Sequence, residues 1–271
     1  MTAPSAAPRN PLAPLRTLGA GLAATSALAA GLVTAAAPEA DAIVFGRPAE
    51  PVPWIVQITT FHSVPGTPCT GVVVDPFWVA TAGHCGPDDP RAYTLGFGNL
   101  GALPAGMGAP LLASPGSVEG LGPGAGLINR VVPVAAVHSP GADVMMLKLA
   151  APAPAPPVMR AGVDPAPGSI LRTYGFGEIT PGGLRSPVAL TGLTRVDRVE
   201  PRGASRIGRG HTVEGGYGFG DSGGPVFQGD RLVGLHSGSD HAARQPDGTN
   251  PAWFESVPAQ NAWIDGVIRR G

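Results

Sequence analysis

Lysine is almost absent from this 271-residue chain, and cysteine and charged residues are scarce. Lys148 is the only lysine, there are two cysteines, and charged residues make up 14% of the sequence. The formal net charge is −1 and the arginines form no continuous stripe. The chain therefore lacks the basic surface with which proteins bind nucleic acid, and we expect no such partner. Two cysteines without a CxxC pair or paired histidines make a poor zinc set, so we expect no metal and no cofactor.

Glycine and proline, in contrast, are abundant. The chain has 41 glycines and 32 prolines, and 43% of its residues are hydrophobic. Glycine weakens the interior of helices and proline removes a backbone donor, so a helical bundle is excluded. The length and the apolar content allow one large or two small domains built from many short strands, which is an all-β fold.

The first 42 residues differ from the rest and have the three parts of a secretory signal peptide. Arg9 and Arg16 precede an alanine-rich, weakly apolar run, and the small residues Ala40 and Ala42 flank Asp41 at its end. A membrane anchor or a disordered arm is the alternative, but no second stop-transfer pattern follows and no other run is long enough to span a membrane. We expect a secreted protein with no stable membrane anchor, and a monomer.

The two cysteines, Cys69 and Cys85, both lie after this segment and are separated by sixteen positions. An even pair in an exported protein predicts one disulfide bond. Closing a loop of this length stabilises a fold by about 3 kcal/mol, mainly by restricting the unfolded chain.

Short apolar runs bordered by Gly, Pro or Asp, such as residues 54–58 after Pro53 and 144–149 after Asp143, predict β-strands on both sides of a proline-rich segment. Proline cannot pair within a sheet, so this segment is expected to be an extended connector. The apolar residues near the C-terminus follow a helical period. The predicted organisation is a β unit at 43–150, a connector at 151–168, a second β unit at 169–257 and a helix at 258–271.

Three sequence motifs carry the groups that amide hydrolysis by a serine requires. Ser222 lies in the glycine-flanked turn GDSGGP, His84 lies in TAGHC beside a cysteine, and Asp143 begins the apolar strand DVMMLKL. A serine hydroxyl becomes nucleophilic beside an imidazole, a carboxylate orients that imidazole, and backbone N–H groups stabilise the oxyanion. We therefore predict Ser222 as nucleophile, His84 as general base, Asp143 as the orienting acid, and the amides of Gly220 and Ser222 as the oxyanion hole.

These motifs, in this order and at this spacing, resemble the trypsin/chymotrypsin family of serine proteases. The GxSxG pattern around Ser222 also occurs in α/β-hydrolases, but there the acid and the histidine follow the serine. The resemblance implies two antiparallel six-stranded β-barrels with the site between them, a polypeptide substrate and an acyl-enzyme mechanism. The preference for arginine over lysine and the Ala, Gly and Pro bias point to a secreted bacterial member of the family.

The resemblance also implies how such an enzyme is activated. Ile43-Val44-Phe45-Gly46 is similar to the family's N-terminus, whose free amine pairs with the aspartate before the nucleophile, here Asp221. Phe45 departs from the usual glycine. A cut after Ala42 would both release the protein and expose the Ile43 amine.

The specificity pocket follows from the same resemblance. Gly216 stands at the base of the pocket, where trypsin has an aspartate, so cleavage after Arg or Lys is not expected. His236 and Ser239 resemble the residues with which glutamate-specific bacterial members hold a carboxylate. The alternative is a pocket for medium apolar residues with Tyr217 and Phe219 at its rim. The predicted lining comprises Gly216, Tyr217, Phe219, His236, Ser237, Gly238 and Ser239.

A catalytically silent homologue that acts as a secreted binding module is the main alternative to a protease. An α/β-hydrolase esterase is a second alternative, which chain order disfavours. The remaining histidines have no metal-ligand spacing and are assigned no role: His62, His138, His211 and His241.

Overall fold

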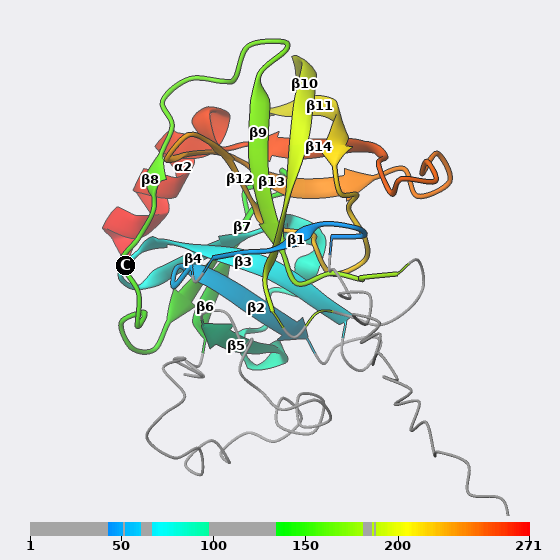
Figure 1. Ribbon diagram of the computed structural model, residues 1–271. Coiled ribbons are helices and arrows are strands. Elements are labelled where there is room, and N and C mark those ends of the chain that lie inside the picture. The colour runs from blue at the N-terminus through cyan, green and yellow to red at the C-terminus, as the bar shows by residue number, and fades with distance from the viewer. Residues whose placement is uncertain (1–42, 51, 61–66, 98–133, 181–185, 187) are drawn as a thin grey trace, which may run out of the picture. The chain divides into compact units, whose positions relative to one another are not determined.

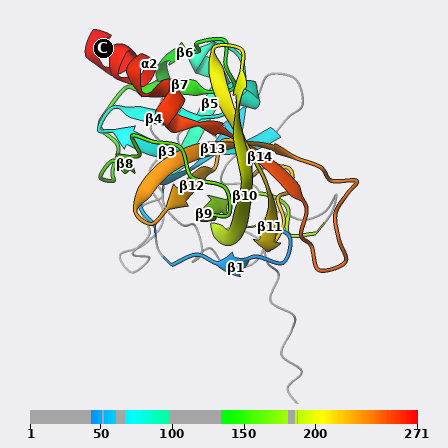
Figure 2. The same cartoon turned by 90° about the horizontal axis from the view of Figure 1, so that it is seen from above.

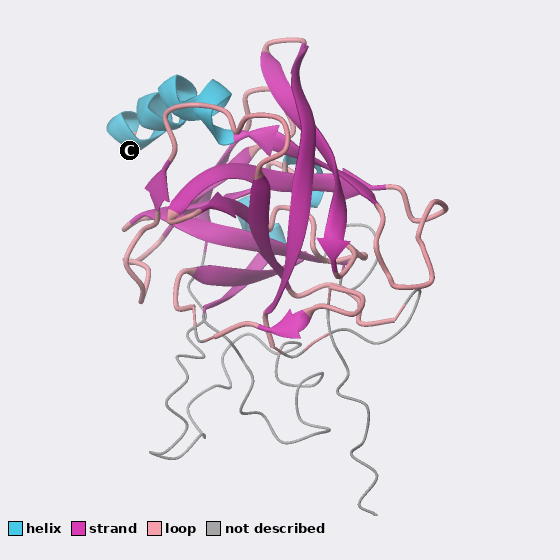
Figure 3. Ribbon diagram, turned by 45° about the horizontal axis from the view of Figure 1, so that its top comes forward, coloured by secondary structure: helices cyan, strands magenta, loops and turns pink. Residues whose placement is uncertain are grey.

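The computed structural model of the chain describes residues 43–50, 52–60, 67–97, 134–180, 186 and 188–271, so the predicted signal peptide lies outside the described residues. Within these residues the protein consists mainly of β-strands arranged in two sheets, with one α-helix at the C-terminal end (Figures 1 and 3). The predicted all-β class and the C-terminal helix are confirmed.

The first sheet contains six antiparallel strands in the order β5-β2-β3-β4-β7-β6. Its core consists of apolar side chains such as Val56, Val73 and Leu147, which alternate along their strands because successive side chains point to opposite faces. The strands are β2 (Ile55–Thr60), β3 (Thr67–Asp75), β4 (Trp78–Thr81), β5 (Tyr93–Phe97), β6 (Val134–His138) and β7 (Met145–Leu149).

The second sheet closes on itself, because β9 pairs with both β10 and β12. The remaining order is β10-β11-β14-β13-β12, antiparallel throughout. Closure gives each of these six strands a partner on both sides over part of its length. They are β9 (Ile170–Gly175), β10 (Leu190–Arg202), β11 (Ser205–Glu214), β12 (Pro225–Gln228), β13 (Arg231–Ser239) and β14 (Pro251–Ser256).

Two short strands modify the predicted boundaries. β1 (Arg47–Pro48) falls in the range expected for the first β unit, yet it pairs with β10 of the second sheet. β8 (Met159–Arg160) falls in the expected connector, yet it pairs in parallel with β13. Each pairs with an end of β10 or β13 that β11 or β14 does not reach, and a short edge strand of this kind tolerates a proline such as Pro48.

The helix α2 (Val257–Arg270) packs where the two sheets meet. Its buried Ile264 and Val267 share one apolar cluster with Trp78 of β4, Met146 of β7 and Leu235 of β13. Figure 2 shows α2 beside β4 and β7. Because one cluster includes residues of both sheets, their relative position is fixed by packing, and with it the cleft between them.

The helix begins at a defined cap. The hydroxyl of Ser256 accepts a hydrogen bond from the backbone N–H of Ala259 at 3.1 Å, and Pro258 occupies the first turn. None of the helices that the structure describes is long and apolar enough to cross a membrane.

The predicted disulfide bond is present. Cys69 on β3 and Cys85 at the end of the 3₁₀ turn η1 (Gly83–Cys85) are joined, with their Cα atoms 6.0 Å apart. Both cysteines are buried. The bond therefore ties η1, which carries His84, to the middle of the first sheet.

Candidate active site

His84 and Asp143 form a close pair on the first sheet. His84 Nδ1 lies 2.9 Å from Asp143 Oδ1 and 3.1 Å from Oδ2, and the His84 backbone N–H donates to Oδ1 at 3.0 Å. A Cβ atom at Gly83 would lie 3.0 Å from the Ala142 carbonyl oxygen, so glycine allows this approach. The carboxylate accepts the Nδ1 proton, which leaves Nε2 as the basic nitrogen.

The surroundings of Asp143 keep it ionised. Burial opposes ionisation, but the hydrogen bonds from His84 and Ser237 outweigh it and lower the pKa of Asp143. Ser237 was predicted as a pocket residue; it lines the pocket, and its hydroxyl also donates to Asp143 Oδ2. The acid is thus held from two sides, by η1 and by β13.

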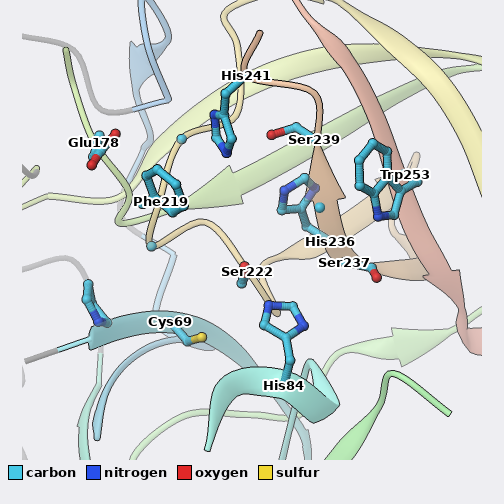
Figure 4. A pocket seen from close by; sticks show the side chains of 14 residues that line it. Cys69, His84, Glu178, Phe219, Ser222, His236, Ser237, Ser239, His241 and Trp253 are labelled. Atoms are coloured by element: carbon cyan, nitrogen blue, oxygen red, sulfur yellow. The ribbon is translucent and has the colours of Figure 1, made fainter. Parts of the chain in front are cut away.

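Ser222 lies in the turn before β12, on the second sheet, and faces the same pocket as His84. Figure 4 shows the two side chains among those that line this pocket. No hydrogen bond joins the Ser222 hydroxyl to the imidazole among the described residues. Catalytic hydrogen bonds are often long in free enzymes and shorten when substrate binds, so Ser222 is a nucleophile candidate by its position.

Every carbonyl of residues 219–222 is held by a hydrogen bond, whereas the N–H groups of Gly220 and Ser222 donate to no group in the described part of the chain. Gly220 has φ of +106°, a conformation that requires glycine. Two free amides in a fixed turn are what an oxyanion hole requires. In chain order the donors to the carbonyls are Glu178 N at 3.0 Å, Thr70 Oγ1 at 2.9 Å, Gly224 N at 2.9 Å and Thr70 N at 2.8 Å.

Asp221 is fully buried beneath this turn. It accepts hydrogen bonds from the backbone N–H of Gly177 at 2.8 Å and of Gly218 at 2.9 Å. Burial raises its pKa to about 7, although these hydrogen bonds oppose the rise. A Cβ atom at Gly175 or Gly177 would overlap the carboxylate, at 2.0 and 2.5 Å, so both glycines make room for it.

The predicted partner of Asp221, Ile43, has a buried side chain, and the next residue, Val44, pairs with Gly216. The segment that begins at Ile43 therefore lies beside the loop that leads to Asp221. No salt bridge to Asp221 occurs within the described residues of this uncleaved chain. The predicted activation ion pair stays a prediction for the cleaved form.

The pocket above His84 and Ser222 has a volume of about 520 Å³. Five of the seven predicted lining residues face it: Phe219, His236, Ser237, Gly238 and Ser239. Gly216 and Tyr217 do not, which corrects the prediction. The backbone of Gly248 covers Gly216, because a Cβ atom there would lie 1.8 Å from the Gly248 oxygen.

Tyr217 is buried beneath the pocket instead of standing at its rim. Its ring stacks on that of His236, with centroids 3.7 Å apart and planes inclined by 13°. The Tyr217 hydroxyl lies 3.2 Å from the hydroxyl of Thr194. The stacked pair forms the floor, so the pocket ends at His236.

His236 is electrically neutral in this position. Burial lowers its pKa to about 3, and its Nδ1 has no hydrogen-bond partner among the described residues. A buried N–H without an acceptor is costly, and Nδ1 is the buried nitrogen without a partner, so we place the proton on Nε2. The floor thus presents a neutral imidazole.

Sequence reasoning missed several lining residues, among them Glu178, His241 and Trp253. His241 had been assigned no role, yet its ring stacks on Phe219 with centroids 4.6 Å apart. These residues come from three separate loops and strands, as Figure 4 shows, and no local motif marks them. Within the described residues, no group of three or more His, Cys, Asp or Glu side chains is placed to hold a metal ion.

The arrangement of two sheets, an acid–histidine pair and a serine turn agrees with a comparison of the sequence with family models. The trypsin model matches residues 43–264. The chain belongs to the trypsin family. No curated protein matches it in sequence.

Several solved structures share the fold. An inactivated protease paralogue of the scabies mite has a TM-score of 0.63 at 14% identity, over 83% of this chain and 97% of that one. Human heparin binding protein has a TM-score of 0.63 at 21% identity, over 84% and 97%. At such identities the likeness shows the fold alone. These two structures come from a mite and from humans, and the predicted bacterial source stays a prediction.

Proposed function

We propose that this trypsin-family protein is a serine endopeptidase that cleaves peptide bonds through Ser222, His84 and Asp143. The observation that carries the proposal is the His84–Asp143 pair, in which His84 Nδ1 lies within 3.1 Å of both carboxylate oxygens while His84 lines the same pocket as Ser222. The free amides of Gly220 and Ser222 lie in the same turn. A nucleophile, a base with its orienting acid, and two oxyanion donors thus meet at one place.

In the proposed reaction the Ser222 oxygen attacks the carbonyl carbon of the substrate and its proton passes to His84 Nε2. The N–H groups of Gly220 and Ser222 donate to the oxyanion that forms. The C–N bond then breaks, and the leaving amine takes the proton from His84. Water, deprotonated by His84, then attacks the acyl carbon; the C–O bond to Ser222 breaks, and the Ser222 oxygen takes the proton from His84 as the acid product leaves. Asp143 stabilises the imidazolium in both halves.

A binding module is the alternative, since one structurally similar protein is described as an inactivated protease paralogue. An organophosphonate separates the two, because it reacts only with an activated serine. The folded protein cut before Ile43 is treated with the reagent and analysed by mass spectrometry, with Ser222→Ala as the control. We expect one adduct, on Ser222. Folded protein without an adduct would favour the binding module.

The proposed specificity is for a neutral side chain of medium size, preferably apolar, before the scissile bond. No lysine or arginine is among the pocket-lining residues, and the His236 floor is uncharged because burial lowers its pKa to about 3. Glu178 adds a carboxylate to the wall. A glutamate side chain would therefore lose hydration without gaining a cationic partner.

Peptide libraries that vary only the residue before the scissile bond test this specificity. We expect the highest kcat/KM for Leu or Met, a lower value for Gln and the lowest for Glu at pH 8. A preference for Glu over Gln would show that His236 and Ser239 bind a carboxylate after all, which is the glutamyl alternative. Cleavage after Arg or Lys would contradict both specificities.

The proposal includes export and activation by one cut after Ala42. Ile43 has φ of +53°, which is a strained conformation for a β-branched residue. This dihedral angle involves the preceding carbonyl carbon, so cutting the bond before Ile43 removes the strain and frees an amine for Asp221. N-terminal sequencing of the secreted protein should begin at Ile43. Additional residues ahead of Ile43 would indicate a zymogen that needs a second protease.

A further inference from the structure

Among the described residues of the first sheet, Thr70 donates the hydrogen bonds that hold the serine turn (residues 219–222). This threonine lies on β3, next to Cys69, and is completely buried. Its backbone N–H donates to the Ser222 carbonyl at 2.8 Å, and its hydroxyl donates to the Gly220 carbonyl at 2.9 Å. Two of the four held carbonyls of the turn are therefore held by Thr70, which belongs to the other sheet.

The Thr70 hydroxyl also joins a third segment. It accepts a hydrogen bond from the backbone N–H of Phe176, just after β9, at 3.1 Å. The Thr70 carbonyl in turn accepts from the hydroxyl of Thr81 on β4, at 2.8 Å. One buried hydroxyl thus connects β3, the segment after β9 and the serine turn, and its own backbone is anchored within the first sheet.

These contacts matter because Gly220 has no side chain to restrict it. A peptide group is planar, so the direction of each carbonyl fixes the direction of the following N–H. A glycine rotates freely about φ and ψ unless the groups on both sides are held. Glu178 N holds the Phe219 carbonyl, in the peptide group that carries the Gly220 N–H, and Thr70 holds the Gly220 carbonyl, in the next peptide group, so both sides of Gly220 are held.

We propose that Thr70 is a positioning residue that keeps the amides of the serine turn directed at the oxyanion of the transition state. This inference rests on the proposed function and adds to it a residue outside the three catalytic motifs. Thr70 touches neither substrate nor reacting atoms. Because an oxyanion hole acts on the transition state more than on the bound substrate, losing the hydroxyl should reduce kcat and leave KM nearly unchanged.

The test compares Thr70→Val, which keeps the shape and removes the hydroxyl, with Thr70→Ser, which keeps the hydroxyl. The control is Thr212→Val on β11, because the Thr212 hydroxyl is also buried and also makes two backbone hydrogen bonds, both with Asn250. All variants are made in the full chain, cut before Ile43, and assayed on a peptide amide with melting temperatures measured in parallel.

We expect Thr70→Val to lower kcat by about 10- to 100-fold with KM within about twofold, since misaligning one oxyanion donor has effects of this order. Thr70→Ser should retain kcat within about threefold and Thr212→Val within about twofold, although Thr212→Val also lowers the melting temperature. Equal kcat for Thr70→Val and Thr212→Val, or a Thr70→Ser variant as slow as Thr70→Val, would overturn the assignment.

If Thr70→Val does not fold, Thr81→Val provides a second test, because it removes the hydroxyl that holds the Thr70 carbonyl. Thr81→Val should lower kcat by about 3- to 10-fold, and an unchanged kcat would also overturn the assignment.

A second measurement separates this inference from the proposed function. If the wild-type protein neither reacts with the phosphonate nor cleaves peptides, the proposed function fails. The hold of Thr70 on the turn is then judged by hydrogen exchange of the Asp221 and Gly224 amides, which bond within the turn. Exchange should be at least about tenfold faster in Thr70→Val than in Thr212→Val. Equal exchange rates in the two variants would refute the inference that Thr70 restrains the serine turn.

Discussion

The buried carboxyl group of Asp221 gives a prediction whose sign depends on whether the chain has been cut before Ile43. In the uncut chain burial raises the pKa of Asp221 from 3.8 to about 7. Because the pKa of Asp221 is higher in the folded chain than in the unfolded chain, the carboxyl group's contribution to the free energy of unfolding is complete below pH 3.8. This contribution is lost as the pH rises to about 7. A difference of about three pH units corresponds to about 4 kcal/mol of stability lost by pH 8.

Asp221→Asn removes the ionisable group and therefore removes this loss. The substitution has its own cost, because the asparagine NH₂ faces one of the two backbone N–H groups that donate to the carboxylate, those of Gly177 and Gly218. A mismatched buried donor costs about 1–3 kcal/mol. In a form that retains Ala42 we therefore expect Asp221→Asn to increase the free energy of unfolding at pH 8 by about 1–3 kcal/mol.

In a form that begins at Ile43 the same substitution should be destabilising. The free amine would pair with the Asp221 carboxylate, and removing one partner of a buried ion pair costs about 3–5 kcal/mol. Urea unfolding of both forms at pH 8, with and without the substitution, measures the two effects. Asp230→Asn is the control, since that aspartate is exposed in a turn and should change stability by less than about 0.5 kcal/mol in either form. The same sign in both forms would refute the proposed pairing of Asp221 with the new N-terminus.

Three further outcomes follow from the site. Asp143→Asn should lower kcat by about 10⁴-fold through the wrong histidine tautomer, and comparable activity in a peptide assay would remove Asp143 from the mechanism. His236→Phe should abolish an acid-dependent loss of stability. Because burial lowers the pKa of His236 from 6.5 to about 3, the contribution of His236 to the free energy of unfolding is complete above pH 6.5 and falls by about 1.4 kcal/mol per pH unit below it. Urea unfolding of both proteins at pH 7 and pH 5 measures the difference. Gly177→Ala should abolish peptide hydrolysis because its Cβ would lie 2.5 Å from the Asp221 carboxylate, whereas Gly162→Ala, with no atom within 4 Å, should be active; full activity of both variants would argue against the tight fit around Asp221.

The strands, the disulfide and the three catalytic motifs were predictable because each depends on short-range patterns. The apolar runs, the paired cysteines and the residues around His84, Asp143 and Ser222 are all visible within a few positions of the sequence. The structure places His84 and Asp143 in contact across 59 positions, as the motifs indicate. Motif order was sufficient to predict that meeting.

The pocket floor was not predictable in the same way. The stacking of Tyr217 on His236 depends on how the loop before the serine lies over β13, and nothing in the neighbouring residues marks it. The role of Thr70 depends on contacts with two segments more than a hundred positions away. The pairing of β1 with β10 is likewise a long-range contact, and a strand of two residues is too short to show a sequence pattern that would predict it.

The disulfide has a consequence for how the protein responds to reducing agents. Cys69 precedes Thr70 and Cys85 follows His84, so the same covalent bond borders the residue that holds the serine turn and the candidate base. Its two sulfur-bearing residues are buried, so a thiol reagent reaches the bond mainly when the chain opens locally. The rate at which a reductant cleaves this bond in the folded protein should therefore report how often the cleft between the sheets opens.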